Sequence, residues 1–250
     1  MISFVEVAGL VLILAAAGIM IWYRIMINKK GNPEFRQMAA FDRLKKAVGL
    51  AVEDGSRIHV TLGKSSLTQA SNPSALAALA TLDRIGSYAS MSDRPPIATS
   101  GDGGLALLSQ DTLKAVYRGA NAPEMYDPNR VYMSGITPLS YIAGTLPIVT
   151  DEDVSAHVMI GNFGPEIGLL TEAATAEGAF TLAASDSLPA QAVIYASAEE
   201  PLIGEELFAA PAYLKPSAAH SASIKTQDFL RWGVIGVLIA GSILKLVGAI

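Results

Sequence analysis

Five short polar segments hold the residues of this chain that are best suited to chemistry. They are residues 63–66 (GKSS), 100–104 (SGDGG), 134–138 (SGITP), 161–166 (GNFGPE) and 185–189 (SDSLP). Backbone N–H groups in such turns, with a helix N-terminus behind them, suit an anionic or hydroxylated ligand. A lysine would add positive charge, and carboxylates could act as acid–base groups or magnesium ligands. The candidate ligand-binding residues are Gly63, Lys64, Ser65, Ser100, Gly101, Asp102, Gly103, Gly161, Asn162, Glu166 and Asp186.

The same five segments also have a purely structural interpretation. Glycine is needed wherever a turn takes a positive φ, and serine, aspartate and proline are ordinary residues at the start of a helix. A fold does not by itself imply a function. We therefore give the structural interpretation more weight, and ligand binding stays open as the alternative.

Two phosphate-binding motifs are incomplete in these segments. Gly63, Lys64 and Ser65 resemble the end of a Walker A motif, which needs another glycine where this chain has Ile58. The missing glycine therefore argues against a P-loop NTPase. Gly101 and Gly103 begin a dinucleotide fingerprint whose third glycine is replaced by Ala106, a substitution that is sometimes accepted. The next predicted strand ends in serine, however, and not in the acidic residue that would bind a ribose.

Other chemistry has little support in the composition. The chain has no cysteine, which excludes disulfides, thiolate metal sites and cysteine nucleophiles. Its three histidines, His59, His157 and His220, are far apart and have no ligand-type spacing, which argues against zinc. His59 and His157 fall in predicted strands and are interpreted as core or sheet-face histidines and not as catalysts. We identify no catalytic residue, no metal ligand and no cofactor site, and a non-enzymatic role is favoured.

The elements that must position the polar segments alternate between strands and helices. Helical patterns of about 10–15 residues follow each extended segment, which predicts parallel strands joined by right-handed crossovers. The predicted fold class is α/β: a Rossmann-like doubly wound parallel sheet of about five strands, bracketed by one N-terminal and one C-terminal transmembrane helix. All five polar segments would then lie at the carboxyl edge of the sheet. The predicted strands are residues 57–62, 96–99, 131–134, 154–160 and 180–184.

Hydropathy divides the chain into five parts. The chain has 250 residues, 51% of them hydrophobic, and a mean hydropathy of +0.38, which is high for a soluble protein. Asn32 and Pro33 are typical of a helix start, and residues 201–214 read as a last helix of the domain. We expect an N-terminal transmembrane helix (1–28), a juxtamembrane amphipathic helix (29–54), the Rossmann-like α/β domain (55–216), a connector (217–229) and a C-terminal transmembrane helix (230–250).

The two terminal segments are long enough to cross a bilayer. Residues 7–23 contain no charge and no proline, and about 21 helical residues span the roughly 30 Å hydrocarbon core. The leading residues MISFVE lack the basic start of a signal peptide, so an uncleaved anchor is expected.

Charges and aromatic residues near these segments predict an orientation. Basic residues lie on the inner flanks of both spans, which places the central domain in the cytoplasm and both termini outside a two-pass protein of the cell membrane. Trp22, Tyr23, Phe229 and Trp232 would share one membrane interface. The basic residues are Arg24, Lys29, Lys30 and Arg36 after the first span, and Lys225 and Arg231 before the second.

Three stretches carry a resemblance to a known family. They are VEDGSRIHVTLG (52–63), PPIATSGDGGLALLSQDTLKAVY (95–117) and PLIGEELFAAPAYL (201–214), the last followed by an apolar segment. The chain resembles an uncharacterised family of membrane-anchored proteins of bacteria and archaea that carries a domain of unknown function. The resemblance covers about residues 40–245. It implies a membrane protein with a central α/β domain, and it implies no activity.

Two functions from different classes remain. The first is a structural or interaction protein that assembles with copies of itself or scaffolds other membrane proteins, and we prefer it. The second is a membrane-tethered sensor or enzyme that binds a small anionic or nucleotide-like ligand above the sheet. The net charge of −5 argues against nucleic acid, and the lipid bilayer is the expected partner. The residues expected to pack helix against helix are Gly233, Gly236, Ala240 and Gly241, although the two spans of one chain could share part of this surface.

Overall fold

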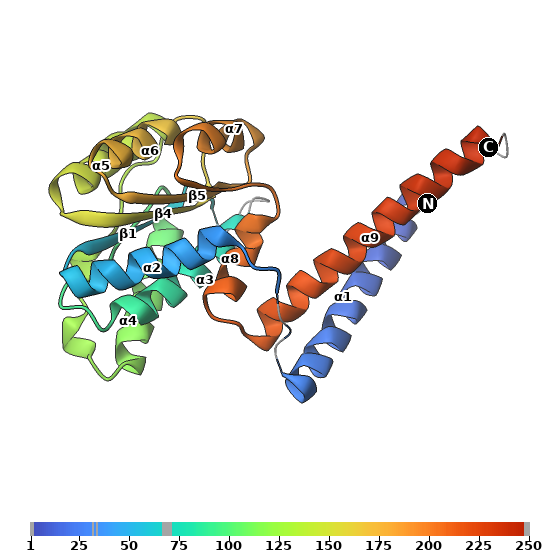
Figure 1. The fold of residues 1–250 in the computed structure, drawn as a ribbon, viewed down its shortest axis with the longest axis horizontal. Coiled ribbons are helices and arrows are strands. Elements are labelled where there is room, and N and C mark those ends of the chain that lie inside the picture. Colours follow the sequence, from blue (N-terminus) through green and yellow to red (C-terminus); the bar gives the residue numbers. More distant parts are fainter. Residues whose placement is uncertain (1–2, 32, 34, 67–71, 248–250) are drawn as a thin grey trace. The chain divides into compact units, whose positions relative to one another are not determined.

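The computed structural model describes residues 3–31, 33, 35–66 and 72–247. The chain forms two compact units. One contains the two ends of the chain, Met1–Arg36 and Pro216–Ile250, and the other is Gln37–Lys215 (Figure 1). Each unit is described by itself below.

The second unit is built on a six-stranded parallel sheet. The strands lie in the order β3-β2-β1-β4-β5-β6, and every neighbouring pair is parallel. This is the order found in dinucleotide-binding Rossmann folds. The predicted α/β class and doubly wound parallel sheet are confirmed, with one strand more than expected. The strands are β1 (Arg57–Gly63), β2 (Ile97–Ser100), β3 (Val131–Met133), β4 (Val154–Asn162), β5 (Phe180–Ser185) and β6 (Glu200–Leu202).

The additional strand is β6, which we had predicted to be the start of a helix over residues 201–214. That helix, α8, spans only Glu206–Leu214. Strand β6 pairs with Leu182–Ala184 of β5 at the edge of the sheet. Pro201 fits there because an edge strand can do without one N–H donor. Gly204, with φ +64°, then turns the chain into the helix.

Helices cover both faces of the sheet (Figure 1). On one face, Ile58, Val60 and Leu62 of β1 belong to an apolar core with the inner sides of the covering helices. On the other face, a second core includes Tyr141, Met159 and neighbouring apolar side chains. The first face carries α2 (Ala39–Asp54), α3 (Asn72–Ala89), α4 (Gly103–Gly119) and α8, and the second carries α5 (Pro138–Asp151), α6 (Ile167–Ala176) and α7 (Leu188–Ser197); two short 3₁₀ turns, Pro123–Met125 and Pro128–Arg130, precede β3.

Helix α2 corrects the predicted juxtamembrane helix over residues 29–54. It begins at Ala39 and belongs to the α/β unit; Pro33 is not helical, and Asn32 lies outside the described residues. Met38 occupies the N-cap position without a side-chain cap, so packing of the apolar face stabilises this helix. That face is buried against the core, as expected of an amphipathic helix, and consists of Phe41, Leu44, Val48 and Ala51.

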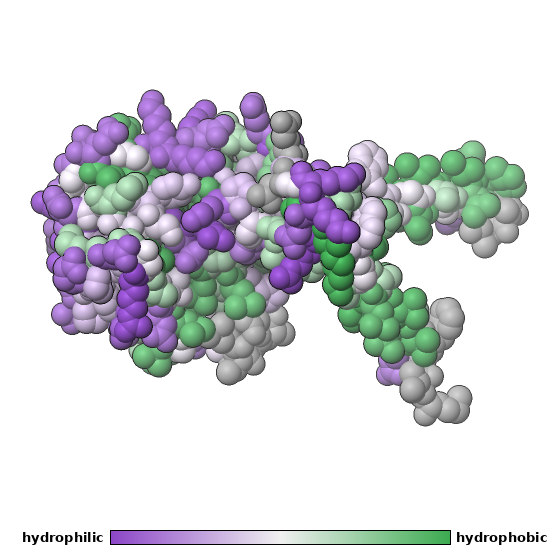
Figure 2. Space-filling view, turned by 90° about the horizontal axis from the view of Figure 1, so that it is seen from below, coloured by the Kyte–Doolittle hydropathy of each residue, from purple (hydrophilic) through white to green (hydrophobic). Residues whose placement is uncertain are grey.

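The first unit consists of α1 (Phe4–Lys30) and α9 (Ala218–Leu246), which contact each other. Both are long and apolar enough to cross a membrane, and the most apolar stretch of each is unburied. The helices diverge from their contact toward the two ends of the chain (Figure 2). The predicted connector, residues 217–229, is instead the beginning of α9. Ser217 caps this helix, and residues 218–232 contain no glycine or proline to interrupt it.

Candidate functional site

The ends of β1 and β4 meet where the strand order reverses, which is where ligands bind in open α/β sheets. Here the two backbones approach closely. A Cβ on Gly63, which has φ +72°, would lie 2.4 Å from the carbonyl oxygen of Asn162, and one on Gly161 would lie 2.0 Å from that of Leu62. The N–H of Lys64 donates to the Asn162 carbonyl at 2.9 Å. The two strand ends are therefore bonded to each other at this point.

Lys64 and Glu166 form an ion pair beside these strand ends. The Lys64 Nζ donates to Glu166 Oε1 at 2.8 Å, and the side chains are 17% and 13% exposed. Burial raises the pKa of Glu166, but the hydrogen bond from Lys64 and the Gly164 N–H more than offset it, so that the pKa is lowered overall. The carboxylate is charged at neutral pH, and an anionic ligand would have to compete with it for the lysine.

The segment after β2 forms the N-terminal cap of helix α4. The Gly101 N–H donates to the Gly63 carbonyl at 2.8 Å, which ties the segment to the end of β1. The Ser100 hydroxyl donates to the Asp102 carbonyl at 2.9 Å. Asp102 is the N-cap of α4, where its Oδ1 accepts the Leu105 N–H at 2.9 Å. Asp102 therefore has a structural role, and Gly103 is the first residue of the helix behind it.

The remaining candidates form separate pairs. Asn162, four residues before Glu166 in the chain, donates from Nδ2 to Asp186 Oδ1 at 2.6 Å. The Ser65 and Ser74 hydroxyls are hydrogen-bonded at 2.8 Å, and both side chains are buried. The structure thus brings several candidates to one edge of the sheet: Gly63, Lys64, Gly101, Gly161, Asn162 and Glu166, with Asp186 beside them. The residues expected to pack helix against helix lie on α9 in the other unit: Gly233, Gly236, Ala240 and Gly241. Among the residues that the structure describes, no three His, Asp or Glu side chains are grouped as metal ligands.

A buried polar cluster on the second face of the sheet was not predicted. The Nδ1 atoms of His59 and His157 lie 3.1 Å apart, and His59 Nε2 lies 2.9 Å from Thr99 Oγ1. Thr61 Oγ1 is hydrogen-bonded to the Tyr141 hydroxyl. All five side chains are buried. The alternation of β1 indicated that His59 and Thr61 share a face, but their partners belong to distant parts of the chain.

Burial decides the charge of this cluster. It lowers the pKa of His59 well below the ordinary value of a histidine, and the nearby His157 ring lowers it further. It lowers the pKa of His157 to about 4. It also raises the pKa of Tyr141. The cluster is therefore neutral at pH 7. Within the described part of the chain, His157 Nε2 has no hydrogen-bond partner.

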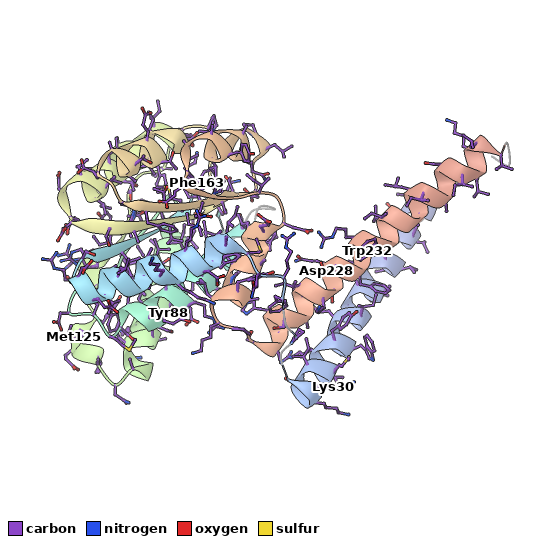
Figure 3. The ribbon with its side chains drawn as sticks, viewed as in Figure 1. Lys30, Tyr88, Met125, Phe163, Asp228 and Trp232 are labelled. Carbon is purple, nitrogen blue, oxygen red and sulfur yellow. The ribbon has the colours of Figure 1, made fainter. Side chains whose placement is uncertain are left out.

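An apolar hollow of about 200 Å³ lies between α2, α3 and the end of α8. Its lining includes Val48, Ile85 and Tyr88, with Lys45 and Glu53 as charged members. The Tyr88 hydroxyl donates to the Leu214 carbonyl at 3.0 Å and so joins α3 to the end of α8 (Figure 3). No motif in the sequence marked this hollow, because its walls look like ordinary amphipathic helices.

Comparison with known proteins gives a family and no activity. Searches of curated proteins and of solved structures found no match. A family described as "Domain of unknown function (DUF6754)" matches residues 2–250, which include both terminal helices and the whole α/β unit. This agrees with the resemblance seen in the sequence. The chain therefore belongs to the DUF6754 family.

Proposed function

We propose that this chain is a two-pass membrane protein that acts as a structural or interaction protein. Its α/β unit would lie in the cytoplasm, both termini would lie outside, and the chain would assemble into a homo-oligomer or hold partner proteins at the membrane. The basic inner flanks of α1 and α9 support this orientation.

One observation carries the proposal of self-association. A Cβ added to Gly233, Gly236 or Gly241 of α9 would meet no atom within 4 Å. Ala240 is exposed on the same helix. This open space beside the three glycines supports their use by a second copy over their use by α1 of the same chain. Because lipid tails are as apolar as leucine, membrane helices associate through such close-packing faces. A second copy of the chain could use this one.

The polar segments of the α/β unit support the same proposal. Lys64 is paired with Glu166, Asn162 with Asp186, and Asp102 with the first turn of α4. Their charges and hydrogen bonds serve the fold, which favours a structural role over a preformed ligand site.

Cross-linking in native membranes tests the proposal. Ala240→Cys introduces the only thiol of the chain, and mild oxidation should join two copies, because a disulfide forms only when the two Cα atoms come within about 7 Å. Adding Gly236→Leu to this variant should lower the fraction of cross-linked dimer severalfold. Ile235→Leu, which lies roughly 100° or more around α9 from each of these four small residues, is the matched control and should leave the dimer fraction unchanged. Absence of a dimer, together with a monomer by light scattering in nanodiscs, would exclude self-association.

A second function is favoured by the position of Lys64. We infer that, if the protein is a sensor or enzyme, a small anionic or nucleotide-like ligand binds at the end of β1 and displaces Glu166 from the lysine. ADP should then raise the melting temperature by mass action. Lys64→Met should abolish this rise, whereas Lys114→Met, an exposed lysine on α4, should retain it. An equal rise in both variants would exclude this site.

A further inference from the structure

A hollow of about 240 Å³ lies in the unit formed by α1 and α9. Tyr23, Met26 and Ile27 give it a mostly apolar wall. Among the lining residues that the structure describes, the charged ones are Lys30 and Lys225. Lys30 lies in the last turn of α1 (Figure 3), and Lys225 lies in the first part of α9. Among the described residues, neither lysine forms an ion pair with a carboxylate. The described part of the hollow thus combines an apolar wall with two positive charges.

The two lysines lie at matching distances from aromatic residues. Lys30 follows Tyr23 by seven residues, and Lys225 precedes Trp232 by seven residues. At the rise of an α-helix, each lysine is about 10 Å beyond its aromatic residue. Tyrosine and tryptophan prefer the membrane interface, so both ammonium groups would lie among the lipid phosphates, and the apolar wall would lie toward the acyl chains.

We propose that this hollow binds the head group of an anionic phospholipid. This inference rests on the proposed insertion of α1 and α9 in a membrane. The two ammonium groups would hold the phosphodiester, and Met26 and Ile27 would contact the start of one acyl chain. Basic pockets between transmembrane helices are suited to anionic head groups. The dipole of α1 places about half a negative charge at its carboxyl end, which would repel an anion. Lys29 and Lys30 in the last turn of α1 offset this charge.

The two tryptophans of the chain provide a test without labels. Trp22 and Trp232 are 60% and 72% exposed on the two apolar helices, where a brominated lipid in contact would quench them. The full-length protein is reconstituted in phosphatidylcholine vesicles containing a small fixed fraction of brominated phosphatidylglycerol or brominated phosphatidylcholine. We expect stronger quenching by the anionic lipid, with a preference on the order of tenfold for two lysines at moderate salt.

Two double variants separate a site from general surface charge. Lys30→Gln with Lys225→Gln should abolish the preference. Arg24→Gln with Lys29→Gln removes two charges from the same end of α1 outside the hollow, and should preserve most of it. Quenching by brominated phosphatidylcholine in each variant verifies that the protein is inserted.

Three outcomes would overturn the lipid site and leave the proposed membrane insertion intact. They are an equal loss of preference in both double variants, no preference in the wild type, and recovery of fluorescence on adding inorganic phosphate, which would identify a soluble anion as the ligand. Failure of both brominated lipids to quench would overturn the proposed membrane insertion and the lipid site with it. Quenching by both lipids without preference would overturn the site alone.

Discussion

Where the two buried histidines of the sheet face each other, only one of the two facing nitrogens can carry a hydrogen. His59 and His157 face each other through Nδ1 atoms 3.1 Å apart, so one ring donates and the other accepts. A proton added to either ring would place a charge in the core beside another ring. Thr99 is the one hydroxyl that is hydrogen-bonded to the pair within the described residues. The pair is therefore stable only while both rings are neutral.

This pair predicts that the protein loses stability in mild acid. The pKa of His157 is about 4 in the folded protein, against 6.5 for an ordinary histidine. As pH falls from 6.5 toward 4, the unfolded chain binds a proton that the folded chain does not bind, so the free energy of unfolding decreases. His157 alone should account for about 3 kcal/mol when this range has been crossed. Urea titrations of the full-length protein in mild detergent at several pH values would measure it.

Two variants make this assignment specific. His59→Leu combined with His157→Leu removes both titrating rings and should flatten the pH dependence. His220→Gln removes the third histidine, which lies outside the sheet at the start of α9, and measures the contribution of that histidine separately. The assignment is wrong if the double variant remains as sensitive to acid as the wild type.

At the scale of the elements, the joined ends of β1 and β4 predict which glycines tolerate a side chain. Gly63 and Gly55 both have positive φ, +72° and +69°. A Cβ on Gly63 would lie 2.4 Å from the Asn162 backbone, whereas one on Gly55 would meet nothing within 4 Å. Gly55→Ala should therefore cost about 1 kcal/mol of stability and Gly63→Ala about 3 kcal/mol or more. Equal shifts in the urea midpoint of the two variants would contradict the close approach.

Helix α4 gives a test of the role of Asp102. As an N-cap, Asp102 accepts the Leu105 N–H, and asparagine can do the same while alanine cannot. Asp102→Ala should lower the free energy of unfolding by about 1 kcal/mol, and Asp102→Asn should be close to the wild type. Thermal unfolding of both variants checks this. If asparagine destabilises as much as alanine, the negative charge is required for another reason.

The strands and helices show which features of the fold local sequence patterns can predict. Alternation and helix-start residues located five strands and most helices, because these signals lie within a few neighbouring residues. Strand β6 was missed because three residues containing Pro201 show no period. The helical start of α9 was missed because serine and histidine resemble a connector, although no residue there breaks a helix.

The contacts of the candidate site depend on strand order, which no local pattern contains. Lys64 and Glu166 are 102 residues apart, and His59 and His157 are 98 apart. The five polar segments could be assigned to one edge of the sheet from the fold class alone. Their internal pairing required knowing that β1 and β4 are neighbours.

At the scale of the whole molecule, the orientation of the proposed membrane protein can be tested with single cysteines, because the natural chain has none. Ser3→Cys lies next to the start of α1, and Ala120→Cys lies at an exposed position after α4. An impermeant maleimide should label the first in intact cells and the second only after permeabilisation. The reverse pattern would invert the topology and show that the basic flanks do not decide it.

The contact between α1 and α9 also affects the α/β unit through the entropy of its unfolded chain. The unit of about 180 residues begins after one of these helices and ends before the other, so their contact closes it into a loop. While that contact persists, the unfolded unit is a closed loop, with fewer conformations than a free coil. A cross-link that closes a loop of about 100 residues raises the free energy of unfolding by about 5 kcal/mol through this loss of conformational entropy. Residues 37–215 expressed alone would retain every contact of their core and still unfold at a lower urea concentration than in the intact chain.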